Sequence, residues 1–122
     1  VALRCTSSYT RLTHIVISGE NSERLPNTSN VSFECVEGEA TLLLLDMAGI
    51  ATSSGSACTT GSAEPSHVLQ AMGIPPVTSR GTIRFSLSRY STEDEVDYIL
   101  EKLVPIVKRL QTLSPLFGDS QA

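Results

Sequence analysis

Residues 82–110 read TIRFSLSRYSTEDEVDYILEKLVPIVKRL, and the hydrophobic period of this stretch changes part-way along. Residues 82–87 alternate apolar and polar side chains, which predicts a half-buried β-strand with Ile83, Phe85 and Leu87 on one face and Arg84 and Ser86 on the other. Thr92–Glu95 is a capping box, a pattern that starts a helix by satisfying its first backbone donors. Apolar residues then recur at helical spacing, at Val96, Ile99, Leu100, Leu103, Val107 and Leu110. The stretch therefore predicts a strand and a long amphipathic helix, which Pro105 is expected to bend.

Upstream of this stretch, three further strands and two further helices are expected. β-Branched or alternating runs predict the strands at residues 14–18, 30–35 and 50–53. Helices that each close on a glycine are predicted at residues 38–49 and 64–73. Residues 1–12 carry few signals and are expected to hold the end of a helix. Short strands joined by unequal connections indicate the α+β class, a small and mostly antiparallel sheet packed against helices.

The composition suits one compact domain, which we expect to comprise residues 1–122. The chain is 40% hydrophobic and 18% charged, as in ordinary globular proteins. Its formal net charge of −4 provides no excess of Lys and Arg of the kind that binds nucleic acid. The apolar run Leu42–Leu45 is far shorter than the roughly 20 residues that span a bilayer, and the N-terminus shows no signal-peptide pattern. Neither a nucleic-acid nor a membrane partner is expected.

The cysteines Cys5, Cys35 and Cys58 are odd in number and include no CxxC pair. Disulfide frameworks use even numbers of cysteines, and zinc sites show closely spaced ligand pairs. His14 and His67 add no metal-ligand spacing, so no metal site is expected. Free thiols indicate the cytoplasm or another reducing compartment.

Cys58 lies in the run SSGSACTTGS, residues 53–62, where every other side chain is small and uncharged. Such a run predicts a loop that gives its thiol freedom instead of burial. A free thiol can attack a bound substrate or carry a group, and both need the thiolate, which is about a few per cent of free cysteine at neutral pH. Lys, Arg and His are absent from the run, and His67 and Arg84 are the nearest groups in sequence that could lower the thiol pKa. The alternative is a passive surface turn.

The remaining polar residues favour structural interpretations. Cys35 shares a predicted strand face with Val31 and Phe33 and is expected to be a core-facing thiol, while Cys5 is expected to be incidental. His67 is expected to be a capping or surface residue. The acidic residues near the start of the long helix fit the positive end of its dipole better than acid–base catalysis; they are Glu93, Asp94, Glu95 and Asp97.

The segment SSGSACTTGSAEPSHVLQAMG, Ser53 to Gly73, closely resembles the active-site segment of the cysteine desulfurases of the NifS/IscS type, within the class-V aminotransferases. The resemblance continues through RLPNTSNVSFECVEGEATLLLLDMAGIA before it and GTIRFSLSRYSTEDEVDYIL after it, and it ends at LSPL, Leu113 to Leu116. It implies the C-terminal small domain of a fold-type I enzyme that depends on pyridoxal phosphate. Ser88 and Ala63 depart from the usual Gly and Leu of this family, and Ser88 is expected to alter backbone freedom just past Arg84.

The resemblance implies an activity and two site residues. These enzymes convert L-cysteine to L-alanine and leave the sulfur as a persulfide on an enzyme cysteine, which Cys58 matches. The sulfur then passes to acceptors, including iron–sulfur scaffold proteins. Arg84 matches the arginine that holds the substrate carboxylate, a role that suits the two-pronged guanidinium. Its alternative is a sheet-surface arginine lying in solvent.

The resemblance also implies that the large cofactor domain is not part of this chain. The only lysines are Lys102 and Lys108, in the final helix, where solvated charge is their expected role. We therefore expect the isolated chain to bind no pyridoxal phosphate and to turn over no cysteine, and the full-length enzyme to be a homodimer that includes its own large domain.

Two other classes of function stay open from the residues alone. In one, the chain is a non-enzymatic sulfur carrier or interaction module, in which Cys58 receives sulfur and passes it on without a cofactor. In the other, the chain is a purely structural domain with a passive loop.

Overall fold

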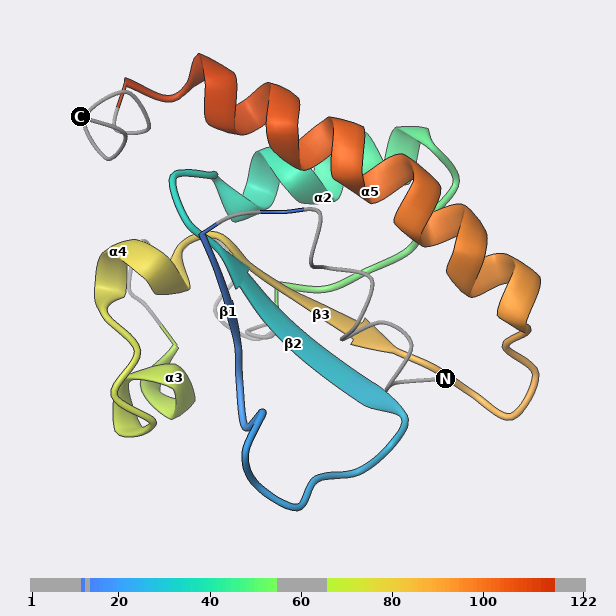
Figure 1. The fold of residues 1–122 in the computed structure, drawn as a ribbon, viewed down its shortest axis with the longest axis horizontal. Helices are drawn as coiled ribbons and strands as arrows, with labels where there is room; N and C mark the ends of the chain where they lie inside the picture. The colour runs from blue at the N-terminus through green and yellow to red at the C-terminus, as the bar shows by residue number, and fades with distance from the viewer. Residues whose placement is uncertain (1–11, 13, 55–65, 116–122) are drawn as a thin grey trace.

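The computed structural model describes residues 12, 14–54 and 66–115 of the chain. Their elements are, in order, β1 (Ile15–Ile17), β2 (Thr28–Phe33), α2 (Gly38–Met47), α3 (His67–Ala71), α4 (Pro76–Ser79), β3 (Thr82–Ser86) and α5 (Glu93–Leu113). The strands form one antiparallel sheet in the order β1-β2-β3 (Figure 1). The predicted α+β class with a small antiparallel sheet is confirmed.

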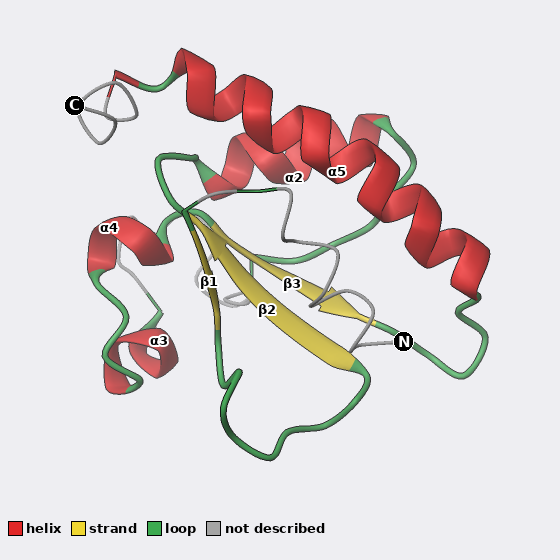
Figure 2. Ribbon diagram, viewed as in Figure 1, coloured by secondary structure: helices red, strands yellow, loops and turns green. Residues whose placement is uncertain are grey.

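The core lies between one face of the sheet and the helices α2 and α5, which run side by side (Figure 2). Alternate strand residues point to this face, and Val31, Phe33 and Ile83 are each 0% exposed. The helices contribute the buried residues Leu45, Val96, Leu103 and Val107. Ile99, Leu100 and Leu110 pack against this cluster, so the predicted apolar stripe of α5 is confirmed.

The capping box of α5 forms as predicted. The backbone N–H of Glu95 donates to Thr92 Oγ1 at 3.2 Å, and the backbone N–H of Thr92 donates to Glu95 Oε2 at 3.0 Å. Glu93, Asp94 and Glu95 occupy the first turn, where they favour the positive end of the helix dipole. The helix continues through the exposed Pro105 to Leu113.

The prediction for Cys35 is wrong, because β2 ends at Phe33 before the strand reaches it. Cys35 is half-buried and has a φ of 61°, in the left-handed region that strands do not use. On the β1 side, His14 is bonded to Glu34, the residue before Cys35: the backbone N–H of Glu34 donates to the His14 carbonyl at 2.9 Å. His14 also has a left-handed φ, of 60°. The chain therefore turns out of the sheet here, and the alternation that placed the thiol in the core stops.

Two other elements differ from their predictions. The expected strand at 50–53 is a single bridge between Ser53 and Arg84. α3 is shorter than predicted, while Gly49 and Gly73, both with a φ of 81°, follow their helices as expected. The sequence analysis also did not predict α4, which is a single helical turn. It begins with a proline, whose missing backbone N–H would have no partner inside the helix at that position. Most of the helix end expected at 1–12, and the start of the helix expected from 64, lie outside the described residues.

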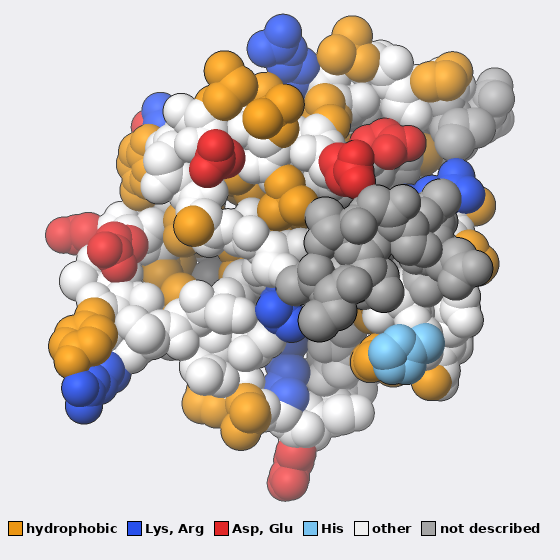
Figure 3. Space-filling view, turned by 180° about the vertical axis from the view of Figure 1, so that it is seen from behind, with side chains coloured by type: hydrophobic (Ala, Val, Ile, Leu, Met, Phe, Trp, Pro, Cys, Tyr) orange, Lys and Arg blue, Asp and Glu red, His pale blue; other side chains and the backbone are white. Residues whose placement is uncertain are grey.

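No helix in the described ranges combines the length and the apolar character needed to cross a bilayer. Figure 3 shows the molecule from behind, where basic and acidic side chains of the described residues are scattered among apolar and polar groups.

Gly81 is a residue at which backbone atoms leave no room for a side chain. It lies between α4 and β3, and its carbonyl accepts from the Phe33 N–H at 3.0 Å. A Cβ at this position would collide with the Phe33 carbonyl oxygen and come within 2.8 Å of the Val36 carbonyl oxygen. Main-chain atoms cannot rotate away as a flexible side chain could, so β2 and β3 would have to separate.

We expect Gly81→Ala to lower the free energy of unfolding by about 2–4 kcal/mol, measured by urea denaturation. The matched control is Gly49→Ala, where a Cβ meets nothing within 4 Å and only the left-handed backbone is penalised, by roughly 1–2 kcal/mol. Equal losses in the two variants would contradict the proposed collision.

Candidate functional site

The sheet face opposite the helices carries four polar residues in one row: Ser18, Asn30, Arg84 and Ser53. The Ser18 N–H donates to the Asn30 carbonyl at 2.9 Å, continuing the β1–β2 pairing. Asn30 is the partner of Arg84 in the β2–β3 register. Arg84 in turn pairs with Ser53, through N···O distances of 2.6 and 3.3 Å. Directly opposed residues in antiparallel strands share a face, so we call these four residues the polar row.

Arg84 is half-buried, and its Nε is buried without a hydrogen-bond partner among the described residues. A buried donor left unpaired costs about 1–3 kcal/mol. The alternative of an arginine lying in solvent therefore does not describe this side chain, and the chemistry of its surroundings suits an anionic acceptor.

One end of this face is closed by a buried pair of hydroxyls. Ser32 and Thr82 oppose each other two pairs along from Asn30 and Arg84, which is the next pair on the same face, and their hydroxyl oxygens are 2.6 Å apart. Their exposed fractions are 0% and 2%, and α4 packs against β2 at this end of the sheet. These two hydroxyls satisfy each other and are buried, so they are not open to a ligand.

Asn30 and Ser18 are site residues that sequence reasoning missed. The Ser18 hydroxyl donates to Asn30 Oδ1 at 3.3 Å, and Arg24 Nη1 donates to the Ser18 carbonyl at 3.4 Å. The alternation of β2 places Asn30 on the polar face, which the sequence could have indicated. That Asn30 opposes Arg84 depends on the strand register, which the sequence pattern did not provide.

Cys58, Cys5 and Ala63 lie outside the described residues. Ser53, the first residue of the cysteine run, lies inside them, and it is bonded on both of its backbone groups to Arg84. The run therefore leaves the sheet directly beside the arginine that the resemblance assigns to substrate binding.

His67 is exposed at the first position of α3, as expected of a surface residue. Within the described part of the chain, no three His, Cys, Asp or Glu side chains gather in a way that could hold a metal ion.

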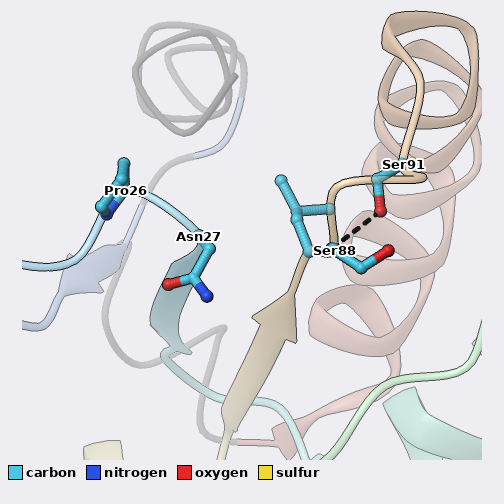
Figure 4. A pocket seen from close by; sticks show the side chains of 5 residues that line it. Pro26, Asn27, Ser88 and Ser91 are labelled. Atoms are coloured by element: carbon cyan, nitrogen blue, oxygen red, sulfur yellow. Dashed lines mark hydrogen bonds between the residues drawn. The ribbon is translucent and has the colours of Figure 1, made fainter.

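A small cavity of about 230 Å³ lies past the end of β3 (Figure 4). Its lining residues are Pro26, Asn27, Leu87, Ser88 and Ser91. Ser88 is tied into a tight turn there: its N–H donates to Ser91 Oγ at 3.1 Å, and its own Oγ accepts from the Tyr90 N–H at 3.2 Å. These hydrogen bonds hold Ser88 at the position where cysteine desulfurases of the NifS/IscS type usually have glycine.

Residues 4–99 match the aminotransferase class-V family. The chain belongs to this family. Among class-V relatives, it is 57% identical over 107 residues to a cysteine desulfurase of Azotobacter chroococcum mcd 1, which is 88% of this chain and 27% of the relative. It is 58% identical over 107 residues to a cysteine desulfurase of Klebsiella pneumoniae, with the same coverage. The chain thus spans about a quarter of the length of these curated relatives, and the resemblance to cysteine desulfurases is confirmed.

Solved structures of class-V relatives agree with the fold. A NifS-like protein from Rickettsia africae ESF-5 superposes with a TM-score of 0.75 at 26% identity, over 87% of this chain and 27% of that chain. A second NifS-like protein superposes with a TM-score of 0.69 at 34% identity, over 88% of this chain and 26% of that one.

Class-V aminotransferases in general use pyridoxal phosphate, and the described residues do not form a site for it. Covalent attachment of this cofactor needs a lysine amine. Lys102 and Lys108 both lie on α5, in the helix layer that covers the opposite sheet face, and the Lys102 ammonium lies 5.6 Å from the centre of the Tyr98 ring. Neither lysine is therefore placed on the sheet face that carries Arg84.

The unpaired Nε predicts that Arg84 lowers the stability of this class-V domain. Arg84→Met keeps an unbranched stem and removes the buried donor, so we expect the free energy of unfolding to stay level or rise by about 1 kcal/mol. Urea denaturation measures it, with Arg80→Met as the control because Arg80 is exposed on the same connection into β3. A clear loss of stability in Arg84→Met alone would count against an unsatisfied arginine.

Proposed function

We propose that the protein containing this chain is a cysteine desulfurase, which converts L-cysteine to L-alanine and transfers the sulfur to Cys58. The relatives that bear the name cysteine desulfurase support this proposal through their identity over most of the chain. The observation that carries it is the backbone pairing of Arg84 with Ser53, because it brings a fixed cation next to the first residue of the cysteine run.

In this proposal, Arg84 and Cys58 have separate roles. The guanidinium of Arg84 holds the α-carboxylate of L-cysteine in a two-pronged, charge-assisted hydrogen bond. Cys58 accepts the sulfur atom of the substrate as its C–S bond breaks, and the substrate carbon gains a hydrogen. One cysteine and one thiol give one alanine and one persulfide, so the exchange balances without an external oxidant or reductant.

The chain acts as the C-terminal small domain of a longer protein in this proposal. The large domain supplies pyridoxal phosphate and its lysine, and the full-length enzyme is a homodimer in a reducing compartment. The persulfide on Cys58 passes its outer sulfur to an acceptor such as an iron–sulfur scaffold protein. A run of small side chains suits a thiol that has to meet both a bound substrate and a second protein.

Replacing Cys58 tests the proposed sulfur transfer. In the full-length protein, Cys58→Ser is expected to reduce alanine formation from L-cysteine at least about a hundredfold, because the sulfur acceptor is lost. Mass spectrometry of the wild-type protein should find one added sulfur on the peptide that contains Cys58. Cys35→Ser is the matched control and should keep both activity and the added sulfur. Full activity in Cys58→Ser would refute the role of Cys58.

A second experiment separates the desulfurase from a cofactor-free sulfur carrier. Residues 1–122 alone, mixed with pyridoxal phosphate and then desalted, should retain no cofactor absorbance and form no alanine from L-cysteine. Addition of a separately produced large domain should restore alanine formation. If a low-molecular-weight persulfide loads Cys58 while the full-length protein forms no alanine, the carrier function replaces the desulfurase.

A further inference from the structure

We propose that Asn30 is a second donor for the substrate carboxylate, acting beside Arg84, and that Ser18 orients its amide. This inference rests on the proposed function, since it extends the carboxylate site that Arg84 begins. It assigns a substrate-binding role to one residue of the polar row and a positioning role to another.

The strand register brings the two side chains together. Asn30 and Arg84 are direct partners between β2 and β3, and the backbone N–H and C=O of Arg84 bond to Ser53, on the side away from Asn30. The Asn30–Arg84 pair is therefore one of the pairs that exchange no backbone hydrogen bonds. In antiparallel sheets such partners have Cα atoms about 4.5 Å apart, and their side chains approach more closely than those of bonded pairs.

The hydrogen bond from Ser18 decides which end of the Asn30 amide is available. Oδ1 accepts from the Ser18 hydroxyl at 3.3 Å, so the amide oxygen is turned toward β1. The Nδ2 group, with two N–H donors, is left for the side of the amide away from Ser18. Because the oxygen is turned toward β1, the amide presents its N–H donors to the site on the side away from Ser18.

Two neighbouring donor groups cannot satisfy each other. Asn30 offers its amide N–H groups, Arg84 offers its guanidinium, and Arg84 Nε has no acceptor in the described ranges. Both residues are half-buried, so a ligand that reaches this face can supply the acceptor. A carboxylate has two oxygens with about four lone-pair positions and can accept from both groups at once. The α-carboxylate of an amino acid fits this requirement.

The test compares variants of the full-length, cofactor-loaded protein. Asn30→Ala removes the donor and is expected to raise KM for L-cysteine on the order of tenfold. Asn30→Asp puts a negative charge opposite the carboxylate and is expected to raise KM roughly a hundredfold. The inhibition constant of the product L-alanine, which has the same carboxylate, should rise by similar factors while kcat changes less.

Ser18 has its own signature as a positioning residue. Ser18→Ala should raise KM a few-fold, and adding it to Asn30→Ala should have no further effect, because Ser18 acts only through the amide. Asn21→Asp adds the same charge at an exposed position of the β1–β2 connection and should leave KM unchanged. Urea denaturation of each variant checks that it is folded. Asn30→Ser replaces an Asn30 variant that does not fold.

The outcomes separate this inference from the proposed function. If the wild-type protein forms alanine and Arg84→Met raises KM, but the Asn30 variants stay within about twofold of wild type, the role of Asn30 is refuted and the desulfurase stands. If the wild-type protein forms no alanine, the proposed function itself fails. Additive effects of Ser18→Ala and Asn30→Ala would refute the positioning role of Ser18.

Discussion

The register between β2 and β3 determines the arrangement of the core and of the candidate site together. Val31 lies opposite Ile83 on the helix-covered face, and Asn30 lies opposite Arg84 on the other. Side chains alternate along a strand, so a slip of one residue would turn the apolar set outward and carry the arginine into the core. The burial of Ile83 and Val31 at 0% exposure therefore also holds Arg84 on the polar face. Gly81 allows this register because only a residue without a side chain can lie so close to the backbone of the preceding strand.

This coupling explains how the domain tolerates an unsatisfied arginine. The buried Nε of Arg84 is a cost to the folded state, and it has no hydrogen-bond partner in the part of the chain that the structure describes. On the opposite face, the flanking residues Ile83 and Phe85 are 0% and 6% exposed beneath α2 and α5. Burial of two large apolar side chains contributes roughly 3–6 kcal/mol, more than the unpaired donor takes away. The strand can therefore present a cation prepared for a ligand and still form a stable part of the sheet.

The sequence predicted those parts of the fold that follow from local periodicity. The strand at Ile83 and Phe85, the apolar stripe of α5 and the capping box at Thr92 all depend on side chains close together in the chain. The core position predicted for Cys35 failed because β2 ends at Phe33 and the chain turns at Glu34 and Cys35, where Cys35 has a φ of 61°. Asn30 was missed because its partner in the site, Arg84, is more than fifty residues away. A hydrophobic pattern encodes neither this turn nor this non-local pairing.

Backbone atoms of Arg84 and Ser53 link β3 to the described start of the cysteine run. Both hydrogen bonds of the bridge join main-chain groups of Arg84 and Ser53, so no side chain of the run is needed to fix where it leaves the sheet. A backbone contact of this kind makes no demand on the side chains of residues 54–62. It is therefore compatible with a thiol that is surrounded in the sequence by serine, threonine, alanine and glycine. The Arg84 side chain takes no part in this bridge, because a residue in an antiparallel sheet bonds through its backbone in the plane of the sheet and extends its side chain out of that plane. One strand residue thus anchors the run with its main chain and faces the polar side of the sheet with its guanidinium.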